Sequence, residues 1–147
     1  MIDTERLVLI VTGAHLRAEQ SDRPMAYRLR DVMLQWLDER VAGPAPIDVL
    51  VCSDLWWLNN EELRDRPTVT IGGPGVNALT AYLSDKVESA FTIDNVLTVQ
   101  MDVLLTRPWA VCWGMDAGST LRSVDAFVER YLDLFLEDAI KRAERSA

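Results

Sequence analysis

The sequence has few cysteines. Its 147 residues include only Cys52 and Cys112, and each lies inside a run of strand-forming residues. A secreted disulfide scaffold would carry more cysteines, spaced through loops. We therefore expect two buried thiols in a reducing cytoplasm.

The sequence also lacks long apolar runs. The longest, such as Leu7 to Val11, are far shorter than the roughly 20 residues that span a bilayer. Asp3 and Glu5 stand among the first five residues, which is unlike the basic start of a signal peptide. These features predict a cytoplasmic protein that does not contact a membrane.

Positive charge is scarce. Fifteen Lys and Arg residues stand against 23 Asp and Glu residues, for a net charge of −8. A nucleic-acid-binding protein needs a basic field to meet phosphates, so that class is excluded. The acidic residues are spread over the polar faces of the expected helices and over loops. Their negative field would repel small anions as well as nucleic acids. Any anion site would therefore depend on local backbone N–H groups.

Histidine occurs once, as His15. One histidine with scattered acids does not make a zinc site, and we predict no metal site. No cofactor is indicated either. The chain has no visible repeat, linker or low-complexity tract, and its length fits a single α/β domain over residues 1–147.

Strand and helix patterns alternate along the chain. Continuous apolar, β-branched runs predict strands at 6–12, 47–52 and 68–71, with further runs at 90–106 and 109–113. The run 90–106 has a weak break near Asp94-Asn95, and Arg107-Pro108 predicts a tight turn before the last strand.

Helices are expected between these runs. Ser21-Asp22-Arg23-Pro24 is typical of a helix start, and Gly43 to Pro46 of a stop. Four further elements complete the order: a loop carrying Trp56 and Trp57, a short helix after Asn59, a helix over about 76–86 and a long helix from about Ser119. Strands separated by helices imply parallel crossovers. We predict a three-layer α/β sandwich: a mostly parallel sheet of about five strands, an antiparallel hairpin and a long C-terminal helix.

In such sheets, ligands bind beyond the carboxyl ends of the strands. Most of the glycines and the histidine fall in segments expected there: 12–15, 52–54, 72–77 and 114–120. Glycine allows close approach of the backbone, and helix starts attract anions, although turn and capping chemistry explains much of this pattern. The candidate ligand-binding residues are Gly72, Gly73, Gly75, Asn77, Asp116, Ser119 and Thr120. Asn77 and Asp116 are also expected to cap the helices that follow them.

The loop from Gly72 to Asn77 is the most distinctive. Residues 73–78 match G-x-G-x-x-A, and Asp94 offers an acid for a ribose. Pro74, however, removes one N–H from the loop, and few strands follow it. A dinucleotide site, a simpler anion site and a structural turn therefore stay open as alternatives.

His15, Cys52 and Asp54 form a weaker catalytic candidate. His15 and Cys52 follow or end strands joined by one crossover, so a Cys–His pair is conceivable, with Asp54 as another partner. Peptidases of the caspase type resemble this arrangement, but their Q-A-C-x-G signature is absent around Cys52. A loop histidine and a buried cysteine are the alternative.

Two classes of function follow. The first is a ligand-binding module for an anionic small molecule. The second is a self-associating or protein-interaction domain that uses the hairpin edge, the Trp56–Trp57 pair and the broad apolar face of the last helix. A Cys–His hydrolase comes third, and the sequence leaves open whether the protein is an enzyme.

Overall fold

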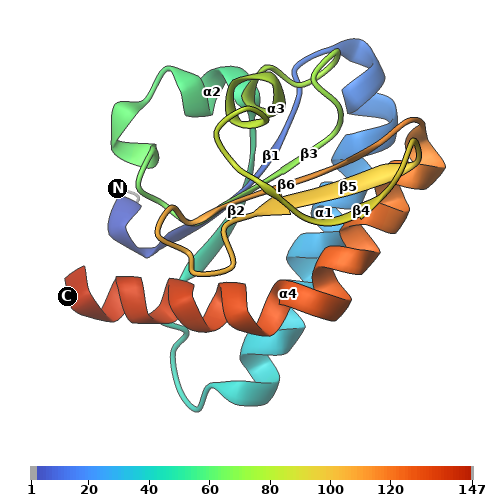
Figure 1. Cartoon of the computed structure of the whole chain (residues 1–147). Coiled ribbons are helices and arrows are strands. Elements are labelled where there is room, and N and C mark those ends of the chain that lie inside the picture. Colours follow the sequence, from blue (N-terminus) through green and yellow to red (C-terminus); the bar gives the residue numbers. More distant parts are fainter. Residues whose placement is uncertain (1–2, 147) are drawn as a thin grey trace.

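The computed structural model describes residues 3–146, which form a six-stranded sheet between two helical layers (Figure 1). The strands are β1 (Leu7–Thr12), β2 (Asp48–Ser53), β3 (Thr68–Ile71), β4 (Ser89–Ile93), β5 (Leu97–Met101) and β6 (Trp109–Gly114). The helices are α1 (Leu16–Arg40), α2 (Asp54–Leu58), α3 (Ala78–Leu83) and α4 (Ala117–Ser146), with 3-10 turns η1 (Thr4–Arg6) and η2 (Glu61–Leu63).

The strand order is β2-β1-β3-β6-β5-β4. Strands β1, β2, β3 and β6 run parallel, whereas β5 is antiparallel to both of its neighbours. This confirms the predicted α/β class. The sheet has six strands, not about five, because Asp94-Asn95 makes a complete turn with Asn95 at φ 61°. Residues 103–106, predicted as strand, lie in the loop before β6.

Each face of the sheet carries its own core. Helices α1 and α4 cover one face, and α2 and α3 lie against the other (Figure 1). Strand β1 is buried along its whole length and supplies both cores with alternate residues.

The apolar stripe of α4 is used inside the chain. Phe127 and Phe135 are buried edge to face, with ring centroids 5.5 Å apart. Among the large apolar residues of this helix, only Leu134 is substantially exposed, at 41%. The apolar face of α4, which the sequence suggested as a surface for self-association, therefore packs on β5, β6 and α1.

Helix α1 begins earlier than predicted. Its first residue is Leu16, and the exposed His15 caps it by accepting a hydrogen bond from the N–H of Arg17 at 3.1 Å. Pro24, predicted at the first turn, lies inside the helix. Its missing N–H deprives only the carbonyl of Gln20, and both residues are exposed, so water can satisfy that group. Asp22 is therefore an interior helical residue and not a cap.

The segment with the tryptophan pair is also helical, where a loop was predicted. The hydroxyl of Ser53 caps α2 by accepting from the N–H of Trp56 at 3.2 Å. Trp57 is fully buried, donates its indole N–H to Oγ1 of Thr68 at 3.1 Å and meets Trp109 edge to face. Trp56 is 38% exposed, so one member of the pair belongs to the core and the other lies at the surface.

Candidate functional site

Asp54 holds together the loops at the carboxyl edge of the sheet. Its Oδ1 accepts from the N–H groups of Ala14 at 3.0 Å and Leu55 at 2.8 Å, and its Oδ2 accepts from that of Ala78 at 2.7 Å. These donors belong to the loop after β1, to α2 and to the start of α3. Both carboxylate oxygens of this buried residue are thus occupied by the backbone, which is a structural role.

Asn77 caps α3, as predicted. Its side-chain oxygen accepts from the N–H groups of Leu79 and Thr80. Its amide nitrogen donates to Oγ1 of Thr70 and to the carbonyl of Ile71. With both ends of the side chain engaged and 1% of the residue exposed, Asn77 shapes the loop from within.

The glycine-rich loop also uses most of its own N–H groups. That of Gly72 donates to the carbonyl of Cys112, and those of Val76 and Asn77 donate to the carbonyl of Gly73. A phosphate-binding loop keeps such groups free for its ligand. Asp94, the predicted ribose acid, follows β4, three strands away from β3 in the sheet.

The start of α4 is capped by its own residues as well. Oδ1 of Asp116 accepts from the N–H of Ser119 at 2.8 Å, and this bond lowers the pKa of the carboxyl group. Oγ1 of the buried Thr120 accepts from the N–H of Gly114 at 3.1 Å. A carboxylate thus already occupies the place that an anion would take.

His15 and Cys52 are held separately, although β1 and β2 are neighbours with Val11 opposite Cys52. Cys52 is buried in the core beneath α2 and α3, and burial raises the pKa of its thiol to about 12. His15 begins the helix on the other face of the sheet. Within residues 3–146, no hydrogen bond joins the two side chains, and the Nδ1 of His15 is engaged as the cap of α1.

Asp22, which is not among the candidates indicated by the sequence, is a buried carboxyl group at the same edge. It is 4% exposed, and its Oδ1 accepts only a long hydrogen bond, 3.3 Å, from the hydroxyl of Ser21. Its Oδ2 lies against Gly72, where an added Cβ would stand 2.4 Å from that oxygen. Gly72 also has φ +110°, so a side chain there would be strained in any case. Burial raises the pKa of Asp22.

A sequence signal for Asp22 did exist. The residue follows Ala18 by four positions and precedes Ala26 by four, which places it on the buried face of α1. The Ser-Asp-Arg-Pro pattern concealed this, because it is also typical of a helix start.

Asp22 lines a cavity of about 690 Å³ at the carboxyl edge. Its walls come from the first turns of α1, the loop 73–76 and residues 113–120. The charged lining groups are Arg17, Asp22 and Asp116, and the larger apolar ones are Pro74, Val76, Trp113 and Met115. Trp113 also borders a second cavity, of about 480 Å³, which lies against β4 and β5.

One further polar group at this edge is unpaired. Oγ1 of Thr12, at the end of β1, is buried and has no hydrogen-bond partner among the residues described. Strand alternation places this side chain on the face covered by α1, the face that also carries Asp22. Across residues 3–146, no group of three His, Cys, Asp or Glu side chains is arranged to hold a metal ion.

Fold and cavity together define a small α/β domain with a hollow at the carboxyl edge of its parallel strands. None of the helices within residues 3–146 combines the length and apolarity needed to span a bilayer. Comparison with models of known protein families and with curated proteins found no match.

Proposed function

We propose that this domain binds a neutral or cationic small molecule in the cavity at the carboxyl edge, with the carboxyl group of Asp22 accepting a hydrogen bond from it. The observation that carries the proposal is this buried carboxyl group, which has one long hydrogen bond and lines the cavity. A buried carboxylate without good partners is costly, and a donor group on a ligand would offset that cost.

The size and lining of the cavity support the proposal. A volume of about 690 Å³ falls in the range of small-molecule pockets. Such pockets combine apolar walls with a few polar groups that fix orientation. Here the indole of Trp113 offers an apolar surface beside the single buried acid.

The chemistry of the lining decides the class of ligand. Two carboxylates, Asp22 and Asp116, face the cavity against one cation, Arg17. The backbone N–H groups that would attract an anion are largely engaged within the protein. The anionic ligand expected from the sequence stays a prediction, and these contacts favour a ligand that donates hydrogen bonds.

A ligand screen against matched variants tests the proposal. Nucleosides, sugars and small amines would be tested by thermal shift against the wild type, Asp22→Asn and Asp125→Asn, which removes an exposed acid from α4. We expect a compound whose stabilising shift is lost in Asp22→Asn and kept in Asp125→Asn, because Asp22 lines the cavity and Asp125 does not.

A second variant tests the cavity without touching Asp22. A Cβ at the exposed Gly75 would meet nothing within 4 Å, so Gly75→Trp adds bulk at the cavity mouth without a backbone clash. This variant should fold normally and bind the compound more weakly. A screen without hits, or a hit that both variants bind as the wild type does, would refute the proposal.

A further inference from the structure

A different cavity, lined mainly by polar groups, opens at the opposite edge of the sheet, where the parallel strands begin. Its volume is about 420 Å³, and it lies between η2, α3, the loop before β6 and α4. Three arginines line it, Arg64, Arg107 and Arg142, against one acid, Asp65. Asp138 already pairs with Arg142, so the local excess of positive charge comes from Arg64 and Arg107, and its sign is opposite to the net charge of −8.

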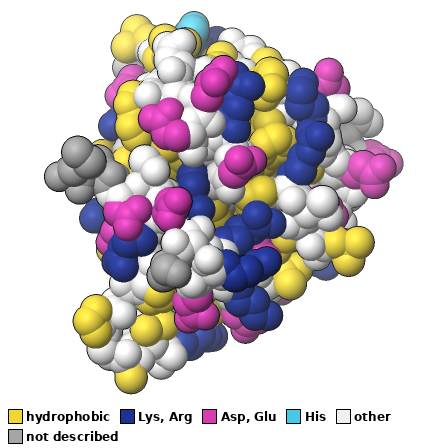
Figure 2. All heavy atoms as spheres, turned by 90° about the vertical axis from the view of Figure 1, so that its left-hand side faces the viewer, with side chains coloured by type: hydrophobic (Ala, Val, Ile, Leu, Met, Phe, Trp, Pro, Cys, Tyr) yellow, Lys and Arg dark blue, Asp and Glu magenta, His cyan; other side chains and the backbone are white. Residues whose placement is uncertain are grey.

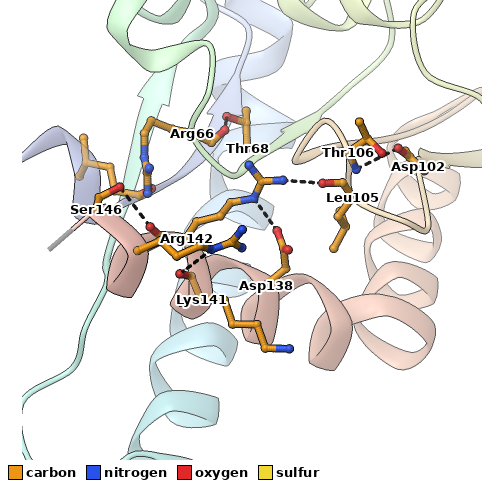
Figure 3. A network of polar contacts seen from close by, with 11 residues as sticks. Arg66, Thr68, Asp102, Leu105, Thr106, Asp138, Lys141, Arg142 and Ser146 are labelled. Atoms are coloured by element: carbon orange, nitrogen blue, oxygen red, sulfur yellow. Dashed lines mark hydrogen bonds and ion pairs between the residues drawn. The ribbon is translucent and has the colours of Figure 1, made fainter.

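Arg142 is fixed in place by the protein. Its Nε donates to Oδ2 of Asp138 at 2.6 Å, and its Nη2 donates to the carbonyl of Leu105. Figure 3 shows its guanidinium group between these two acceptors, beside the loop in which Asp102 accepts from the N–H of Thr106. One cation of the cavity is therefore oriented in advance, which lowers the entropy cost of binding a ligand.

Arg64 has an unused donor. Its Nε is buried and has no partner within residues 3–146. The backbone of this residue is anchored, because its carbonyl accepts from the indole N–H of Trp109 at 2.9 Å. A buried donor without an acceptor costs free energy, and a small movement of this side chain toward an anion in the cavity would supply the acceptor.

Arg107 and Arg64 also lack acidic partners. In the described part of the chain, neither takes part in an ion pair. The guanidinium carbon of Arg107 lies 5.3 Å from the ring centre of Trp109. This contact favours the side chain near the cavity but leaves its charge unneutralised.

A fourth arginine adds to the positive field. Arg66 is 7% exposed and donates from Nε and Nη2 to the carbonyl of Leu7. Burial lowers its pKa, and the nearby guanidinium of Arg142 lowers it further. Figure 2 shows many Lys and Arg side chains, with Asp and Glu side chains among them, on the face that lies on the left-hand side of Figure 1.

We propose that this arginine-lined cavity is a binding site for a compact oxyanion with at least two negative charges. Planar guanidinium groups match the oxygens of phosphate and carboxylate groups, and several of them together favour a multivalent anion. A phosphate ester and a polycarboxylate share this chemistry. The site is distinct from the cavity of Asp22, and neither proposal depends on the other.

Calorimetric titration with pyrophosphate and with citrate, at low ionic strength, tests the site and distinguishes the two sources. The variants are Arg64→Gln and Arg107→Gln, with Arg28→Gln as the control, because Arg28 is an exposed arginine of α1 outside the cavity. Arg142 is left unchanged because it also anchors the loop at Leu105. Thermal melts check that each variant folds.

We expect at least one of the two anions to bind, and added salt to weaken that binding. Each cavity variant should lose about tenfold or more in affinity, as expected for a lost charge-assisted hydrogen bond, whereas Arg28→Gln should bind as the wild type does. Absence of binding by both anions, or an equal loss in all three variants, would overturn the proposal.

Discussion

The three hydrogen bonds of Asp54 make the sharpest test of how the carboxyl edge is built. Asp54→Ala removes the acceptor of the N–H groups of Ala14, Leu55 and Ala78 at once. Asp54→Asn keeps an oxygen in the place of Oδ1 but turns an NH₂ group toward the N–H of Ala78. The two variants therefore remove different numbers of the same bonds.

The magnitudes follow from this difference. A hydrogen bond to a charged group contributes about 1.5–3 kcal/mol, so the loss of Oδ2 alone in Asp54→Asn should cost about 2 kcal/mol. Asp54→Ala loses all three bonds but also recovers the cost of burying a carboxylate, which gives about 4 kcal/mol in total. Domains of this size have a stability of about 5–15 kcal/mol, so both variants should fold.

Urea denaturation followed by tryptophan fluorescence measures these costs. We expect the midpoints to fall in the order wild type, Asp54→Asn, Asp54→Ala, with an unchanged dependence on denaturant. A loss below about 1 kcal/mol in Asp54→Ala would refute the role assigned to Asp54, because its carboxylate connects the loop after β1 and the start of α3 to α2 through three charge-assisted hydrogen bonds.

Three further predictions concern buried groups. Burial raises the pKa of Asp22 in the folded state, so the folded state holds this proton more tightly than the unfolded state does. The free energy of unfolding should therefore fall as the pH rises above the usual range of carboxyl pKa values. Denaturation of wild type and Asp22→Asn from about pH 4 to about pH 8 should show this fall in the wild type only, and a flat wild-type profile would contradict it. Cys52, with its thiol pKa raised to about 12, should resist iodoacetamide in the folded protein and react in urea, and fast labelling of the native protein would argue against its burial. Trp57→Phe removes the bond to Thr68 and part of the packing, and should cost about 1–3 kcal/mol in chemical denaturation, against almost nothing for Trp56→Phe at the surface.

Local patterns predicted the elements well. Continuous apolar runs correctly indicated β1, β2, β3 and β6. The pattern is clearest for β1 and β3, which are buried along their whole length and so need apolar or β-branched residues at nearly every position. The strand order was not readable, because it depends on pairings between distant segments such as β3 and β6. The hairpin of β4 and β5 was predicted only as a weak break, since Asp94-Asn95 lacks the glycine that usually marks such turns.

The grouping of the loops was easier to predict than the state of their polar groups. The loops expected at the carboxyl edge do lie together there, because the parallel direction of the strands fixes that arrangement. Which groups stay free could not be read from the sequence. Asn77 and Asp54 are residue types that often bind ligands, but here their side-chain oxygens accept hydrogen bonds from backbone N–H groups. Asp22, inside a helix, accepts only one long hydrogen bond, from a serine hydroxyl.

The placement of α4 also affects the order in which the protein can fold during synthesis. Strand β3 in the middle of the sheet must wait for β6, which leaves the ribosome only after β4 and β5. The apolar surface of β5 and β6 then stays open until α4 follows. Folding is therefore expected to complete only after the last helix has emerged, and before that moment the nascent chain exposes the surface that chaperones bind.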